Sequence, residues 1–212
     1  MDTKKLLNFL HLIEGLKNLE RWRGQVFWRH YPQRERYESV ADHSWRMALM
    51  LTLVAENLAK PIDLAKAMKM ALIHDLPEII AGDQSPLGSD GTGKDSHAYN
   101  KSAAERKFQM EKEAAEKIFA ELPKQQGDEL LELWLEFESQ KSFEAKVVMA
   151  VDKLEGKLQA AEYLQGAMFK EHLDFNLTYR VEMYKVDPVL KELGDLILNE
   201  FKEGYKEFTL PI

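Results

Sequence analysis

Apolar residues recur every three to four positions through most of the chain, which is the spacing of one face of an α-helix. In residues 4–20 this stripe consists of Leu6, Leu10, Ile13 and Leu16. The same period predicts further helices over residues 42–59, 61–81, 98–121, 126–139, 141–170 and 187–203. Asp42 fits the cap of the second helix, Pro61 the first turn of the third, and Pro188 the start of the last.

Two segments lack this period. Residues 21–41, "RWRGQVFWRHYPQRERYESVA", are rich in arginine and aromatic residues. Residues 82–97, "GDQSPLGSDGTGKDSH", have the composition of a loop, and their length favours a functional lid over a plain connection. No alternating strand pattern and no internal repeat stands out. We therefore predict an all-α protein, a globular multi-helix bundle.

Composition narrows the possible functions. The chain has 212 residues, 45% hydrophobic and 31% charged, as expected of one soluble globular domain. Its formal net charge of −7 argues against a nucleic-acid polymer as partner but allows a small phosphorylated substrate. Because there is no cysteine, any metal must be bound by His, Asp or Glu. No stretch approaches the length of a membrane span and no signal peptide is recognisable, so we expect a cytoplasmic protein.

Ionisable residues interrupt the third predicted helix in "ALIHDLPEIIAGD". On a helix, Glu78 would lie on the same side as His74 and Asp75, four and three positions earlier. Burying three such groups is costly unless they are paired or bind a cation. Taken alone, the stretch favours a structural histidine with a carboxylate partner.

Four other residues shift this interpretation towards a site. His43 lies among apolar residues at the start of another helix, and Asp152 interrupts an apolar run in "AKVVMAVDKLEGKL". Asp83 follows a glycine at the mouth of the long loop. Pro77 predicts a bend at the cluster, or a helix that ends near residue 76 with a short turn carrying the glutamate. Each residue also has an ordinary structural explanation.

Together these residues predict a metal site formed by His43, His74, Asp75 and Asp152. Two imidazoles and two carboxylates suit one divalent transition metal ion (Mn, Co, Fe, Ni or Zn) better than Ca²⁺ or Mg²⁺. An octahedral ion would keep two positions open, for a water and a substrate oxygen. That arrangement is typical of hydrolysis.

The ordered set resembles the HD-domain phosphohydrolases, in which a His, a later His-Asp doublet and a distant Asp bind one metal. The match covers residues 4–170, and "ESVADHS" with "HDLPEIIAGD" is similar to the 5′-deoxynucleotidase branch. The resemblance implies a single HD domain over residues 1–212, with a metal-site core over 21–170 and a last helix packing on it. It also implies a homodimer that hydrolyses deoxynucleoside 5′-monophosphates to nucleoside and phosphate.

The resemblance also implies roles for individual residues. Glu78 matches the family glutamate that orients or activates the attacking water, and Asp83 matches an aspartate that serves the leaving group or the sugar. The Arg21-Trp22 pair resembles one in which the arginine grips the phosphate and the tryptophan borders the sugar. A solvated surface charge explains Arg21 equally well.

Two departures from that branch leave alternatives open. The segment before His43 is longer than in bacterial deoxynucleotidases, so Arg23, Arg29, Arg34 or Arg36 could share the arginine role. The loop after Asp83 is polar and glycine-rich where the branch has a short apolar-proline turn. The alternatives are an HD-domain hydrolase of another nucleotide phosphate and a non-catalytic module that binds nucleotide or metal.

Overall fold

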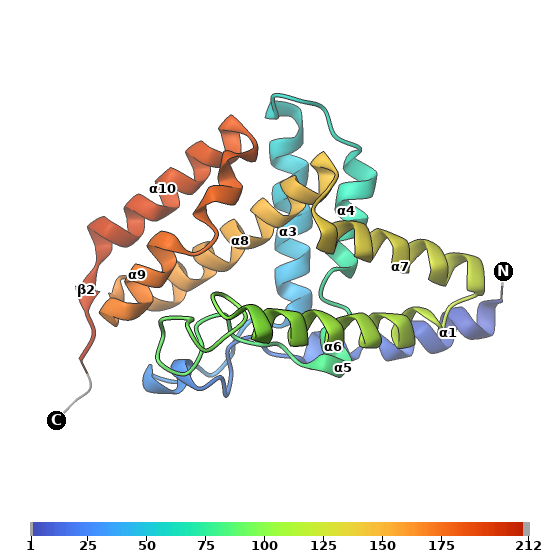
Figure 1. Cartoon of the computed structure of the whole chain (residues 1–212), viewed down its shortest axis with the longest axis horizontal. Helices are drawn as coiled ribbons and strands as arrows, with labels where there is room; N and C mark the ends of the chain where they lie inside the picture. The colour runs from blue at the N-terminus through green and yellow to red at the C-terminus, as the bar shows by residue number, and fades with distance from the viewer. Residues whose placement is uncertain (1, 210–212) are drawn as a thin grey trace.

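The computed structural model describes residues 2–209 and confirms the all-α class (Figure 1). In chain order the helices before the long loop are α1 (Thr3–Leu12), α2 (Gly15–Asn18), α3 (Val40–Val54), α4 (Leu64–Ile73) and α5 (Glu78–Ala81), with 3₁₀ turns η1 (Phe27–His30) and η2 (Ala55–Asn57). After the loop come α6 (Lys101–Phe119), α7 (Lys124–Ser139), α8 (Phe143–Leu164), α9 (Lys170–Thr178), η3 (Val181–Val186) and α10 (Pro188–Gly204). Two short strands, β1 (Ala167–Met168) and β2 (Lys206–Glu207), pair in parallel.

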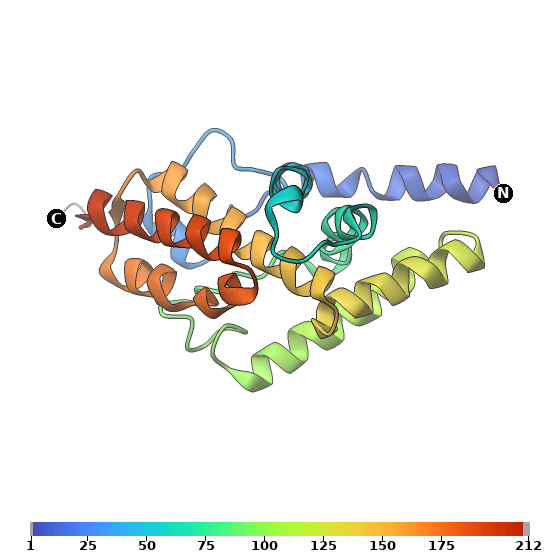
Figure 2. The ribbon, with the colours of Figure 1, turned by 90° about the horizontal axis from the view of Figure 1, so that it is seen from above.

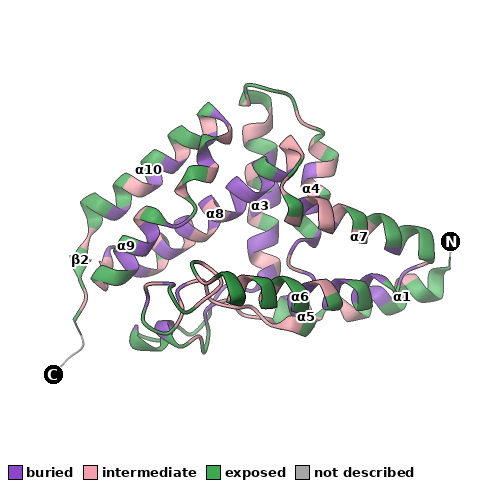
Figure 3. Cartoon of the chain, in the orientation of Figure 1, coloured by how far each residue is buried: buried purple, intermediate pink, exposed green. Residues whose placement is uncertain are grey.

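Helix α8 is the centre of the molecule. It packs against α3, α4, α7, α10 and η3. Figure 2 shows α9 and α10 at one end of the molecule and α1 and α7 at the other. Buried residues follow α8 and the facing side of α3 (Figure 3), because these sides of the two helices pack against neighbouring helices. A polar residue on these two faces is therefore held in the interior.

Two helices begin at other residues than the sequence suggested. Helix α3 is capped by Ser39, whose side chain accepts from the Asp42 amide while the Asp42 carboxylate accepts from the Ser39 amide. Asp42 is thus the third residue of a capping box, not the cap. Helix α4 is capped by Asp63, which accepts from the Lys66 amide, so Pro61 precedes the helix.

The structure decides between the two interpretations of Pro77, because the helix ends before the proline, and earlier than expected. Helix α4 stops at Ile73, residues 74–77 form a turn, and α5 begins at Glu78. The proline has no amide hydrogen to continue the α-helical ladder. Of the two sequence interpretations, the one in which the helix ends before Glu78 is correct.

The predicted helix over residues 141–170 was too long. Helix α8 ends at Leu164, and the chain reverses through Gly166, whose φ is +84°. A Cβ at Gly166 would come within 1.8 Å of the Gly204 carbonyl oxygen. This close approach lets β1 pair with β2, and α9 and η3 follow as elements that the sequence did not predict.

The long loop packs on the aromatic segment that precedes α3. Gly91 lies against the Phe27 ring, where a Cβ would come within 2.3 Å of a ring carbon, and Leu87 is buried. The loop therefore contacts residues 21–41, the other segment without helical period (Figure 1). Its role as a lid remains a prediction.

The single helix expected over residues 4–20 is interrupted by a turn at residues 13–14, between α1 and α2, whereas three later helices agree with the expectation within a few residues. Helices α6, α7 and α10 lie where the apolar period placed them. Trp134 and Phe137 are buried core residues, which is typical of aromatics at helical spacing. Within residues 2–209, no helix combines the length and the apolar character that crossing a bilayer requires.

Candidate metal centre and substrate cleft

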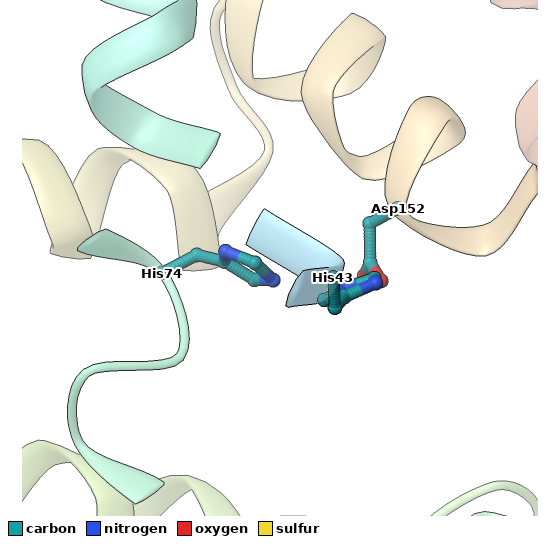
Figure 4. Close-up of side chains that lie close together, drawn as sticks. All are labelled: His43, His74 and Asp152. Carbon is teal, nitrogen blue, oxygen red and sulfur yellow. The ribbon is translucent and has the colours of Figure 1, made fainter. Parts of the chain in front are cut away.

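The four predicted metal ligands come from three parts of the chain and converge beneath α8. His43 lies in the first turns of α3, His74 and Asp75 lie in the turn after α4, and Asp152 lies in the middle of α8. Figure 4 shows the His43, His74 and Asp152 side chains gathered at one point.

The distances fit ligands of a single ion. One ligand atom each from His43, His74 and Asp152 lies within 4.8 Å of the other two. Asp75 Oδ2 lies 3.1 Å from His74 Nε2 and 3.8 Å from His43 Nε2. The structure thus brings together all four side chains that the sequence proposed.

The histidines expose lone pairs that nothing else in the described structure uses. His74 Nδ1 donates to the Ala71 carbonyl oxygen at 2.9 Å, which leaves Nε2 as an unprotonated acceptor. Within residues 2–209, His43 Nε2 and His74 Nε2 are buried without a hydrogen-bond partner. Because an unsatisfied buried acceptor is costly, a bound cation is the natural partner of both atoms, and the donor set fits a divalent metal.

Glu155 orients His43 and was missed by the sequence analysis. It is fully buried, contacts His43 Nδ1, and accepts from Arg46 Nε at 2.7 Å. A carboxylate on the far nitrogen fixes the imidazole tautomer and strengthens the ligand. Glu155 interrupts the same apolar run as Asp152, so the same signal could have identified it.

Two further carboxyl groups, those of Glu78 and Asp83, lie beside the metal ligands. Glu78 is buried, and its Oε2 has no hydrogen-bond partner within the described chain. Burial, with the nearby charges of Asp75 and Asp83, holds the pKa of Glu78 well above its ordinary value. A carboxyl group with a raised pKa is suited to accept and release a proton near neutral pH.

Asp83 is held by the segment that carries Arg21. Its Oδ2 accepts from Gln25 Nε2 at 2.6 Å and from the Trp22 amide at 3.4 Å. Burial raises the pKa of Asp83, and the charge of Asp75 adds to this effect, although Arg21 opposes it. The Gly82 turn (φ +77°) thus places a second proton-holding group at the mouth of the site.

Arg21 is not a solvated surface residue. Its side chain is 14% exposed, and Nη1 lies 3.4 Å from Glu38 Oε1 and 3.5 Å from Glu155 Oε2. The other arginines of this segment, namely Arg23, Arg29, Arg34 and Arg36, are exposed. Next to Arg21, Trp22 stacks on Trp28 with ring centroids 4.5 Å apart. The structure therefore favours Arg21 among the candidate arginines.

Two clefts meet at the metal ligands. The first, of about 630 Å³, has aromatic walls formed by Trp22, Trp28, Phe175 and Tyr179, with Arg21 and Asp83 at its edge. The second, of about 830 Å³, is more polar and includes His74, Asp75 and the Lys107–Glu111 ion pair. Asp152 and Lys153 line both clefts, and Lys153 Nζ lies 2.6 Å from Asp152 Oδ2. The aromatic walls of the first cleft suit a small organic ligand.

Comparison with known proteins gives concordant matches. The HD domain profile matches residues 13–193. The 5′-deoxynucleotidase HDDC2 of Homo sapiens is 38% identical over 161 residues, which is 76% of this chain and 69% of that protein. A crystal structure of a predicted metal-dependent phosphohydrolase from Magnetospirillum magnetotacticum MS-1 superposes with a TM-score of 0.69 at 25% identity, covering 95% of this chain and 92% of that one. The PH0347 protein of Pyrococcus horikoshii OT3 superposes with a TM-score of 0.65 at 27% identity, covering 92% and 99%.

Proposed function

This chain belongs to the HD-domain family, and from that premise we propose that it is a metal-dependent 5′-deoxynucleotidase. It hydrolyses deoxynucleoside 5′-monophosphates to nucleoside and phosphate. The observation that carries the proposal is that His43 Nε2, His74 Nε2 and the nearby Glu78 Oε2 are buried without a hydrogen-bond partner within residues 2–209. A purely structural metal site needs no such carboxyl group.

We propose that His43, His74, Asp75 and Asp152 together hold one divalent transition metal ion: Mn, Co, Fe, Ni or Zn. Such an ion, when bound, lowers the pKa of a water molecule and polarises a phosphoryl oxygen. Glu155 and the Ala71 carbonyl oxygen hold the two imidazoles in the orientation that presents Nε2. The two imidazoles would therefore be oriented by the fold before an ion binds.

The protein's own groups carry the proton transfers and neutralise charge. Glu78 takes a proton from the attacking water as the new phosphorus–oxygen bond forms. The phosphorus–O5′ bond then breaks, and the proton held by Asp83 passes to the departing 5′ oxygen. Arg21, at the edge of the aromatic cleft, neutralises the phosphoryl oxygens, and Trp22 borders the sugar.

A substrate panel tests this proposal. Phosphate release is measured from deoxynucleoside monophosphates, their ribose counterparts, triphosphates and cyclic dinucleotides, with each metal added to metal-free protein. We expect deoxynucleoside monophosphates to react fastest. Activity restricted to triphosphates or cyclic dinucleotides would identify another HD-domain hydrolase, and metal binding without any phosphate release would identify a non-catalytic module.

We also propose that residues 1–212 form a single HD domain that acts in the cytoplasm as a homodimer. Trp45, Leu49 and Leu53 lie four residues apart on α3 and are 64%, 44% and 66% exposed. An apolar stripe of this kind is costly in water and suits a second copy of the chain. Light scattering of the protein and of Leu49→Asp tests this: we expect a dimer that the substitution turns into a monomer.

A further inference from the structure

The floor of the aromatic cleft contains a buried lysine without a carboxylate partner. Lys157 is 5% exposed and lines the cleft. Its ammonium group donates to the Asn176 carbonyl oxygen at 2.7 Å, and no acidic residue within residues 2–209 forms an ion pair with it. Lysines are rarely fully buried unless they are paired, so this position needs an explanation.

Burial disfavours the charged form of this lysine. Burial, together with the charge of Lys153, lowers the pKa of Lys157 to about 7. Its one hydrogen bond leaves donor capacity that the described side chains do not use. The Lys157 side chain could therefore donate a further hydrogen bond to an acceptor on a bound ligand.

His172 gives the cleft floor a second donor. Tyr31 Oη accepts from the Phe169 amide at 3.1 Å and lies 2.9 Å from His172 Nδ1, to which it donates. This hydrogen bonding assigns the ring proton of His172 to Nε2. Burial, followed by the charge of Lys157, lowers the pKa of His172 to about 3, so the ring stays neutral. The floor therefore offers donors to whatever occupies the cleft.

The distance between Lys157 and the candidate metal ligands is suitable for a bound nucleotide. Lys157 follows Asp152 by five residues on α8, which is about 7.5 Å along the helix axis. Gly156 and Ala160 line the same cleft and leave it open beside α8. A nucleotide whose phosphate lies at Asp152 and Arg21 would extend past its sugar to place the base between the aromatic walls, over Lys157.

We propose that Lys157 recognises an exocyclic oxygen of the nucleobase, so that the cleft favours oxo bases such as thymine, guanine and hypoxanthine over adenine. The proposal rests on the proposed function for the position of the phosphate. In its charged form, a lysine donates to a carbonyl oxygen but has no lone pair with which to accept from the amino group that adenine carries at the same place. Lys157 is thus a specificity-determining residue.

The test compares two nucleosides of the same size, 2′-deoxyinosine and 2′-deoxyadenosine. Their bases differ at C6, which carries an oxo group in hypoxanthine and an amino group in adenine, and at N1, which carries a hydrogen only in hypoxanthine. Calorimetry gives the dissociation constant of each for the wild-type protein, for Lys157→Met, and for Lys146→Met as a control. Lys146 lies on the same helix but is exposed. We expect the wild type to bind deoxyinosine more tightly by about tenfold or more, as expected for one hydrogen bond from a charged donor.

In Lys157→Met we expect the affinity for deoxyinosine to fall and the affinity for deoxyadenosine to stay unchanged, so that the preference is lost. Lys146→Met should keep the preference. Equal affinities in the wild type, no detectable binding of either nucleoside, or an equal loss for both in Lys157→Met would overturn the proposal. If the variant does not fold, the wild-type comparison still decides. Binding of a nucleoside does not require hydrolysis of a phosphate ester. If the protein binds deoxyinosine selectively but releases phosphate from no nucleotide, the proposed function is contradicted and the inference about Lys157 still holds.

Discussion

Several residues of the candidate site have a buried polar atom without a hydrogen-bond partner in the described structure. His43 Nε2, His74 Nε2 and Glu78 Oε2 are buried and without a hydrogen-bond partner within residues 2–209, although such atoms are nearly always satisfied in folded proteins. The neighbouring groups orient the two imidazoles but, in the described part of the chain, form no hydrogen bond with the three atoms. The arrangement is typical of a site that a cation and a substrate complete.

Glu78→Gln is expected to separate metal binding from catalysis. The amide cannot accept a proton from water, so we expect phosphate release to fall by roughly 100-fold or more. Metal content, measured by atomic emission, should stay at the wild-type level because the four ligands are intact. Turnover close to wild type would remove Glu78 from its assigned role.

Glu155→Ala is expected to weaken the metal site without removing a ligand. Loss of the contact with His43 Nδ1 frees the imidazole, and we expect metal affinity to fall by about 10- to 100-fold. Competition with a chromophoric chelator measures this affinity. Glu162→Ala is the matched control, because Glu162 also pairs with Arg46 but lies at the surface. Equal effects of the two substitutions would argue against orientation of His43.

Residue types in an apolar run were enough to select the candidate metal ligands that the structure brings together, whereas Arg21 could not be placed from sequence. His43, His74 and Asp152 each interrupt a helical stripe, which gives a local signal. Burial of the Arg21 guanidinium depends on Glu38 and on Glu155, which lies more than a hundred residues away. Residues 21–41 have no period from which that packing could be inferred.

At the scale of elements, short polar motifs decide where helices begin, and tertiary pairing decides where one of them ends. The Ser39–Asp42 capping box and the Asp63 cap are visible in the sequence once read as motifs. The end of α8 is different, because it depends on the approach of Gly166 to Gly204 and on pairing of β1 with β2. These contacts are remote in sequence, so periodicity alone extended the helix.

The turn that carries His74 is held by α7. Trp134 Nε1 donates to the His74 carbonyl oxygen at 2.9 Å, and the Trp134 side chain is fully buried. We expect Trp134→Phe to lower the free energy of unfolding by about 1–3 kcal/mol, because the buried carbonyl loses its partner.

Urea denaturation of the metal-free protein measures this change, and Phe108→Leu is the control. Phe108 stacks on Trp134 but is partly exposed, so its substitution should cost less. A larger loss for the control would show that ring packing, and not the hydrogen bond, stabilises the turn.

At the scale of the whole molecule, the candidate catalytic groups and the aromatic cleft lie where three helices and two irregular segments meet. Residues 21–41 and the loop over 82–97 contact each other and border the aromatic cleft. We therefore expect these two segments, which have little secondary structure of their own, to contribute to substrate selectivity. Helix α8 connects the candidate metal site with the aromatic cleft, because it carries both Asp152 and Lys157. The all-α fold class was predictable from the helical period of the apolar residues, but the meeting of these segments at the cleft was not.

The buried lysine is expected to make stability depend on pH. Burial lowers the pKa of Lys157 to about 7, whereas an unfolded lysine titrates near 10.4. Between these values the unfolded chain binds more protons, so Lys157 makes stability rise with pH over that window. We expect Lys157→Met to be more stable than wild type at pH 7 and to lack this rise.

Chemical denaturation of wild type and Lys157→Met at pH 7, 8 and 9 measures the difference between them. Lys146→Met should follow the wild-type slope, because that side chain is exposed. A variant slope equal to the wild-type slope would show that Lys157 is charged in the folded protein over the whole range.

The most direct test of the account is a metal titration of the metal-free protein, with phosphate release from a deoxynucleoside 5′-monophosphate as the readout. If His43, His74, Asp75 and Asp152 form one catalytic metal site, there should be no release without metal. Release should then rise linearly and level off at one equivalent of metal per chain. Release that does not depend on metal, or no release with any of Mn²⁺, Co²⁺, Fe²⁺, Ni²⁺ and Zn²⁺, would contradict the account.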